Sequence, residues 1–132
     1  MREEIVFTCG EGRLGIQVQA ILTGDGVAVF LTGGEKPHVG GVAMSVPRHP
    51  RTASGQRPQT WVTPRSGHRD SDVATLVAEQ LCRETGCCAA VIAGIHIDRA
   101  SRQEIDALVQ NSLEAARLLA DRIKQIVEIE HA

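Results

Sequence analysis

Three short polar segments of this chain could carry chemistry, because each places a histidine and a charged neighbour beside an apolar stretch. The first surrounds His38, the second begins at His68, and the third joins His96 to Asp98. Histidine and carboxylate side chains can bind a metal ion, exchange protons or hydrogen-bond a polar ligand. No two histidines have the His-x-x-x-His spacing of a helical metal-ligand pair, so spacing alone does not choose among these chemistries.

The third segment follows the clearest element of the sequence. Residues 88–95 are an unbroken apolar run, typical of a strand buried on both faces. The run ends with isoleucines that alternate with His96 and Asp98, so these two polar side chains share one face. Ser101 and Glu104 then have the spacing of a capping box, which predicts a helix start. A strand that delivers polar groups to a helix N-terminus favours a ligand site, and a plain turn with a core-edge histidine is the alternative.

Glycines surround the first segment. Gly40 and Gly41 follow His38, and a second glycine pair precedes it. Glycine lets another backbone or a ligand approach closely, so this segment is either a binding loop or a plain hairpin loop followed by a bulge. The candidate residues before His38 are Thr32, Gly33, Gly34, Glu35 and Lys36.

Residues 47–69 form a long Pro- and Arg-rich loop that contains no acidic residue. Loops of this length are usually functional or disordered. Residues 59–63 within it predict a short strand, and His68 stands just before a helix start, where it could face the same pocket as His96. Guanidinium groups match phosphate oxygens, so the loop predicts phosphate capture or a solvated, mobile segment. Its arginines are Arg48, Arg51, Arg57, Arg65 and Arg69.

Alternating apolar and polar residues predict an N-terminal antiparallel sheet. Residues 16–22 alternate as expected of a strand with one face on the core. Residues 23–26 predict a hairpin turn with positive φ at glycine, and residues 27–31 return as its second arm. Residues 4–9 and 39–46 are predicted as a further strand and a third arm.

Two helices are predicted in the second half of the chain. The first has Asp70 or Ser71 as its N-cap and stops at Gly86, and the second runs from Ser101 to about Glu128. The length of the second also favours a contribution to an oligomer interface. Each helix has an apolar stripe predicted to face the core: Val73, Leu76, Val77 and Leu81 in the first, and Ile105, Leu108, Val109, Leu113, Ala116, Ala120, Ile123 and Val127 in the second.

These elements predict one domain over residues 1–132, of the α+β (or α/β) class. Its sheet is mixed and mainly antiparallel, with N-terminal hairpins followed by helix–strand–helix in two or three layers. A net charge of −2 and only three aromatic residues argue against a nucleic-acid partner. The N-terminus lacks an apolar signal region, and no apolar run approaches the roughly 20 residues of a membrane span. We therefore expect a cytoplasmic protein without a membrane partner, whose cysteines are mostly buried thiols.

Three motifs together resemble the prenylated-flavin chaperone family, the LpdD-like proteins associated with UbiD-type decarboxylases. They are Leu-Thr-Gly-Gly-Glu-Lys-Pro-His-Val-Gly at 31–40, His-Arg-Asp at 68–70, and Ala-Gly-Ile-His-Ile-Asp at 93–98. The resemblance runs from about Gly10 to Glu128. It implies a non-catalytic protein that holds prenylated FMN, or FMN, as bound cargo and assists maturation of a UbiD-type decarboxylase. We further expect a homo-oligomer.

The resemblance also implies a cofactor-binding set. Lys36 or arginines would hold the FMN phosphate, and His38 and His96 would hydrogen-bond polar edges of the isoalloxazine ring. The full set is Thr32, Gly33, Gly34, Glu35, Lys36, His38, His68, Arg69, His96 and Asp98.

Two other functions stay open on the sequence alone. One is a small metal-dependent hydrolase that uses His38, His68, His96 and Asp98, which tightly held zinc would favour. The other is a structural decarboxylase subunit whose glycine loop is an interface. Co-purification with a large decarboxylase, without flavin, would favour this last reading.

Overall fold

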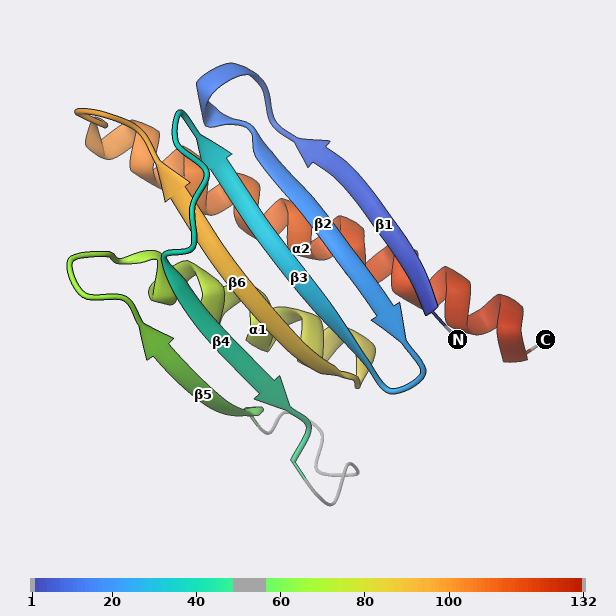
Figure 1. Cartoon of the computed structure of the whole chain (residues 1–132). Helices are drawn as coiled ribbons and strands as arrows, with labels where there is room; N and C mark the ends of the chain where they lie inside the picture. Colours follow the sequence, from blue (N-terminus) through green and yellow to red (C-terminus); the bar gives the residue numbers. More distant parts are fainter. Residues whose placement is uncertain (1, 49–56, 132) are drawn as a thin grey trace.

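A six-stranded mixed sheet carries both helices on one of its faces (Figure 1). The computed structural model describes residues 2–48 and 57–131. The strand order is β1-β2-β3-β6-β4-β5, in which β3 and β6 pair in parallel and the other pairs are antiparallel. This confirms the predicted fold class. The elements are β1 (Arg2–Cys9), the short 3-10 helix η1 (Gly12–Leu14), β2 (Ile16–Thr23), β3 (Gly26–Gly34), β4 (Gly41–Val46), β5 (Gln59–Pro64), α1 (Asp70–Thr85), β6 (Cys88–His96) and α2 (Arg102–His131).

The β2–β3 turn forms as predicted, but a side-chain hydrogen bond stabilises it and not a positive φ at glycine. The Thr23 hydroxyl accepts a hydrogen bond from the Gly26 amide at 3.2 Å. Neither Gly24 nor Gly26 has a positive φ, so the predicted conformational reason for these glycines is wrong. Gly26 is instead required by space, because a Cβ there would lie 2.9 Å from the carbonyl oxygen of Cys88 on β6.

The predicted third arm forms as β4 but does not continue the N-terminal meander. Strand β6 lies between β3 and β4 and pairs with both, because its apolar run suits the middle of a sheet. The strand predicted at 59–63 is β5, which pairs with β4. Residues 49–56 of the predicted loop, including Arg51, lie outside the described residues. None of the described helices combines the length and hydropathy needed to cross a bilayer.

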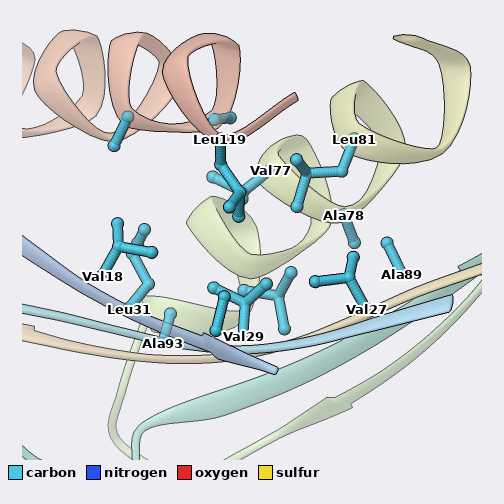
Figure 2. Close-up of a cluster of buried hydrophobic side chains, with 14 of the residues drawn as sticks. Val18, Val27, Val29, Leu31, Val77, Ala78, Leu81, Ala89, Ala93 and Leu119 are labelled. Atoms are coloured by element: carbon cyan, nitrogen blue, oxygen red, sulfur yellow. The ribbon is translucent and has the colours of Figure 1, made fainter. Parts of the chain in front are cut away.

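The core lies between the sheet and the two helices (Figure 2). Alternate residues of the strands, such as Val18 and Leu31, meet Val77 of α1 and Leu119 of α2, and all four are buried. Each such side chain contributes about 1.5–3 kcal/mol through burial. The cysteines only partly follow the prediction of buried thiols: Cys82 is buried, whereas the other three are half-buried.

The two helix starts differ from each other. The Ser101–Glu104 capping box is confirmed, with both reciprocal hydrogen bonds at 3.1 Å. The predicted N-cap of α1 is wrong: Arg69 occupies that position without a capping side-chain bond. Asp70 is the first helical residue, and its carboxylate is turned away from the helix toward the site described below. Gly86 ends α1 as predicted, with a left-handed φ of 71°.

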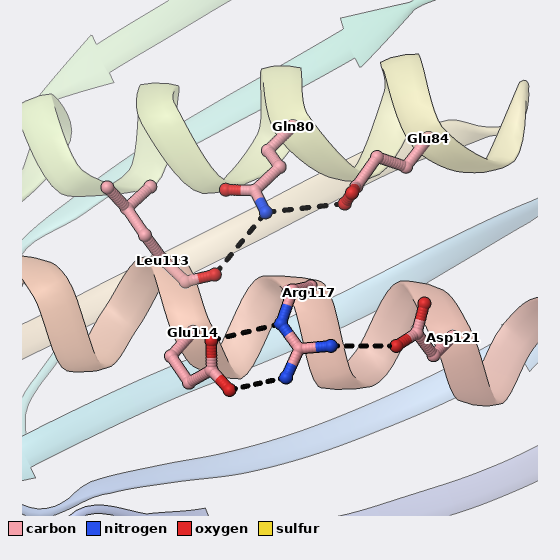
Figure 3. A network of polar contacts seen from close by, with 6 residues as sticks. All are labelled: Gln80, Glu84, Leu113, Glu114, Arg117 and Asp121. Carbon is pink, nitrogen blue, oxygen red and sulfur yellow. Dashed lines mark hydrogen bonds and ion pairs between the residues drawn. The ribbon is translucent and has the colours of Figure 1, made fainter.

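The predicted apolar stripes are right in their centres and wrong at two positions. Leu76 of α1 is 45% exposed and Ile105 of α2 is 47% exposed. Toward the middle of α2 the helices meet each other, and Gln80 of α1 donates to the Leu113 carbonyl of α2 at 3.3 Å (Figure 3). Arg117 binds two carboxylates along the outer face of α2. The helices thus form one layer that covers one face of the sheet.

Candidate functional site

The three polar segments meet at one edge of the sheet. Strands β3 and β6 are parallel, so their carboxyl ends lie together and the loops that follow them become neighbours. The segment 35–40 follows β3, and the segment 97–101 follows β6. The N-terminus of α1 approaches the same edge. This topology explains how residues more than fifty positions apart in sequence come into contact.

Asp70 is the centre of the site, although the helix-start pattern predicted only a capping role for it. Its side chain is 9% exposed. One carboxylate oxygen accepts the backbone N–H of Ile95 at 2.9 Å. The other lies 2.9 Å from Nε2 of His38 and 3.6 Å from Nδ1 of His68. A single carboxylate therefore joins the end of β6 to two of the three predicted histidines.

His38 is held by both of its ring nitrogens. Nδ1 lies 2.8 Å from the carbonyl oxygen of Lys36, and Nε2 lies 2.9 Å from the Asp70 carboxylate. A carbonyl only accepts, and an ionised carboxylate only accepts. The Lys36 carbonyl therefore accepts from Nδ1, and the two contacts together fix the orientation of the His38 ring beside Asp70.

Two glycines make this close packing possible. A Cβ on Gly40 would collide with the Asp70 carboxylate, and a Cβ on Gly94 would collide with the backbone of His38. The backbone of Gly40 also donates to the Ala93 carbonyl of β6 at 2.9 Å. The glycines thus allow the segment after β3 to lie directly on β6.

A second polar group holds the loop after β6. Glu35 donates its backbone N–H to the His96 carbonyl at 2.7 Å, and its carboxylate accepts the Asp98 N–H at 3.1 Å. Asp98 in turn accepts from Nε2 of His96 at 2.8 Å and lies 3.6 Å from Nζ of Lys36. The hydrogen bond from His96, helped by the charge of Lys36, lowers the pKa of Asp98. Asp98 is therefore an anion that fixes the His96 ring.

A pocket of about 310 Å³ opens beside these groups. His68, Arg69, Asp70 and His96 contribute to its polar side. Its other walls are apolar and come from α1, β6, the loop after β6 and α2. The half-exposed Ile105, predicted as a core residue, is one of them; its apolar neighbours are Val73, Ile95, Ile97, Ala100, Leu108 and Val109. The pocket therefore combines a polar side with an apolar side.

Of the predicted site residues, only His68, Arg69 and His96 line this pocket. Five others lie beside it in the contacts around Asp70 and Asp98, namely Gly34, Glu35, Lys36, His38 and Asp98. The remaining two are set apart from these contacts. Thr32 is buried within β3, opposite Gly94. Gly33 contacts the neighbouring strand, where a Cβ would lie 2.8 Å from the Gly15 carbonyl oxygen. Sequence reasoning missed Asp70 and the apolar lining. The His-Arg-Asp motif contained the signal for Asp70, but the capping interpretation already accounted for that residue.

Among the described arginines of the predicted phosphate loop, only Arg69 lines this pocket. Arg57 instead binds the buried Glu79 through two hydrogen bonds, at 2.8 and 3.2 Å. Arg65 donates to the Val39 carbonyl at 2.8 Å. Arg57 and Arg65 therefore bind groups of the protein itself.

His38, His68 and Asp70 could together hold a metal ion. One ligand atom from each lies within 4.8 Å of the others. This set differs from the one proposed on the sequence, since Asp70 takes the place of His96 and Asp98. A metal bound there would replace the contact between Nε2 of His38 and the Asp70 carboxylate.

Comparisons with known proteins add a family and a fold. A family model described as the prenylated flavin chaperone LpdD-like domain matches residues 10–124. No curated protein matches the chain. A chain in the crystal structure of a novel chaperone complex for yeast 20S proteasome assembly is similar, with a TM-score of 0.61 and 16% identity. The match covers 94% of this chain and 96% of that one, and at this identity it shows a shared fold alone.

Proposed function

Because this chain belongs to the LpdD-like family of prenylated flavin chaperones, we propose that it binds prenylated FMN and passes it to a UbiD-type decarboxylase without catalysing a reaction. The observation that carries this proposal is the mixed lining of the pocket between β6, α1 and α2. A prenylated flavin combines an apolar fused ring with a polar pyrimidine edge and an anionic phosphate. The pocket offers a matching surface for each of the first two parts.

The size of the pocket limits what enters it. About 310 Å³ is near the lower end of the roughly 300–1,000 Å³ of small-molecule sites. The ring system therefore enters against Ile105 and Val109, and the ribityl phosphate stays outside. Arg69 on the rim and Lys36 nearby are the cations that meet the phosphate. A cargo held partly outside the protein can be released to a second protein.

The histidines contribute hydrogen bonds to the ring. His96 is fixed by Asp98, and His68 stands beside the His38–Asp70 pair. Polar edges of a flavin offer both acceptors and donors, so a rigid set of imidazoles orients it without large rearrangement. His38 acts mainly by holding this arrangement, whereas His68 and His96 face the pocket.

The test is retention of reduced prenylated FMN after anaerobic incubation and desalting, read by absorbance and mass. The wild-type chain should retain the modified flavin stoichiometrically, and the His38→Ala/His96→Ala variant should retain much less. Unchanged retention in this double variant would remove both histidines from the site. Transfer is then measured as activation of an apo-decarboxylase of the UbiD type. Loaded protein that activates no better than free cofactor would refute delivery.

The phosphate assignment needs a control for net charge. Lys36→Ala/Arg69→Ala and Arg122→Ala/Lys124→Ala each remove two positive charges, and the second pair lies far along α2. Only the first double variant should weaken flavin binding. Equal losses in the two variants would point to a long-range charge effect and not to phosphate contact.

Metal-dependent hydrolysis is the second candidate, because His38, His68 and Asp70 converge. A metal bound there could activate water. Stoichiometric zinc that survives dialysis, together with hydrolysis that the His68→Ala variant loses, would favour this function over flavin binding.

A further inference from the structure

We propose that the sheet face opposite the two helices, which no helix of residues 2–48 and 57–131 covers and which we call the uncovered face, is the interface of a homodimer. In this dimer two copies pack their sheets face to face. Both helices lie on the other face (Figure 1). The strand registers define two neighbouring rows of side chains that cross all six strands on the uncovered face. They are Glu4, Ile21, Ala28, Ala90, Met44 and Trp61 in one row, and Val6, Gln19, Phe30, Ile92, Val42 and Thr63 in the other.

These two rows are unusually apolar for a solvent-facing surface. Nine of the twelve residues are apolar and Glu4 is the only charged one. Val6 and Trp61 are 62% and 54% exposed. Single exposed apolar residues are ordinary, but a contiguous patch of this kind marks an interaction site. When one face of an antiparallel sheet is exposed to solvent, the side chains on that face are normally polar.

The area suits a second copy. Strands about 4.8 Å apart and about 3.3 Å per residue give this sheet a face of roughly 600 Å². Two copies would thus bury on the order of 1,200 Å², the lower part of the range for specific dimers. Two sheets that pack in this way lie about 10 Å apart, so their side chains interdigitate.

The shape of the face is complementary to itself. A hollow of about 370 Å³ lies over the β1-β2-β3-β6 side, with Val6, Ile21 and Phe30 in its lining. Trp61 projects from β5 at the opposite edge. A two-fold axis along the strands, between β3 and β6, would place β5 of each copy over β1 of the other. Each tryptophan then enters the hollow of the other copy.

The same axis also prevents repulsion between the Glu4 carboxylates of the two copies. It places Glu4 of each copy opposite β5 and therefore keeps the two Glu4 carboxylates apart. A buried indole N–H needs an acceptor, and the Glu4 carboxylate in the hollow lining can supply it. A single arrangement thus buries the apolar rows, fills the hollow and avoids contact between like charges.

The first test compares two double variants by light scattering and sedimentation. Met44→Glu/Ile92→Glu adds two acids to the face, at positions 42% and 36% exposed. Leu76→Glu/Leu118→Glu adds two acids at helix positions 45% and 38% exposed. Wild type and the helix variant should have twice the mass of one chain, and the sheet variant should be monomeric. A monomeric wild type, or a sheet variant that remains dimeric, would overturn the proposal.

The second test needs no substitution. Trp61 is the only tryptophan, so its emission reports this interface directly. On dilution of the wild-type chain, the emission maximum should move to longer wavelength over the same concentration range in which the mass halves. Dissociation that leaves the emission unchanged would place the interface elsewhere and overturn the proposal. Both tests are independent of flavin binding, so their outcome does not depend on the proposed function.

Discussion

Replacing Asp70 by alanine should destabilise the protein far more than the same change at Asp72. Both are acids in the first turn of α1, so each loses the favourable helix-dipole interaction, worth about 0.3–1 kcal/mol. Asp72 is exposed. Asp70 is buried and holds the Ile95 amide and the His38 ring. The difference between the two variants therefore isolates the hydrogen bonds of Asp70.

The expected magnitude follows from those bonds. A hydrogen bond to a charged acceptor contributes about 1.5–3 kcal/mol, which applies to the Ile95 amide. The bond to His38, which is near the surface, adds up to about 1 kcal/mol. Asp70→Ala should thus lower the free energy of unfolding by about 2–4 kcal/mol and Asp72→Ala by about 1 kcal/mol or less. Asp70→Asn keeps an acceptor for Ile95 and should lie between them.

Urea unfolding followed by circular dichroism measures these differences. All variants are compared at one protein concentration, because a dimer makes the midpoint concentration-dependent. The slope of the unfolding free energy against urea should stay constant, since the same surface is exposed in each case. If Asp70→Ala and Asp72→Ala agree within about 0.5 kcal/mol, Asp70 is not the structural centre of the site and the reasoning from its contacts is wrong.

Three further predictions address the Arg57–Glu79 pair, the glycines and the pocket wall. The hydrogen bond from Arg57 lowers the pKa of Glu79, so its stabilisation is present above the unfolded pKa and is lost as pH falls through the folded pKa. The difference in unfolding free energy between wild type and Arg57→Ala should therefore shrink from pH 7 to acid pH, and a difference that grows would contradict this sign. Gly94→Ala should cost about 1–3 kcal/mol or more because its Cβ meets the His38 backbone, whereas Gly24→Ala, with open space around it, should change the urea midpoint little. Ile105→Ala should weaken flavin retention with little loss of stability, whereas the fully buried Ile123→Ala should cost about 2–5 kcal/mol; equal stability losses would place Ile105 in the core.

Local patterns predicted the elements well, because each rests on contacts within a few residues. The alternation at 16–22, the Ser101–Glu104 capping box and the stop at Gly86 are all confirmed. The place of β4 beyond β6 was not predictable in this way. The position of β4 depends on where the long apolar strand β6 joins the sheet. This is decided by pairing between residues about fifty positions apart in sequence.

The site was predicted only in part, because some of its contacts join residues that are distant in sequence. His68 and His96 were expected to share a pocket, and both line it. Asp70 was missed because a helix N-terminus explains an aspartate locally, and its true partners, Ile95 and His38, are distant in sequence. Ile105 was assigned to the core because periodicity indicates a face of a helix but not where that face runs past the edge of the sheet.

The central place of β6 dictates an order of events during synthesis. The pairings among β1, β2 and β3 involve only residues before 35, and β4 pairs with β5 within residues 41–64. Among the described residues, the three-stranded unit β1–β3 and the β4–β5 pair are joined only by β6, at 88–96, which lies between them. Until β6 has been made, each unit has an open strand edge able to pair with another chain. Strand β6 also supplies His96 and the Ile95 N–H that holds Asp70, so the site is complete only when most of the chain has been made.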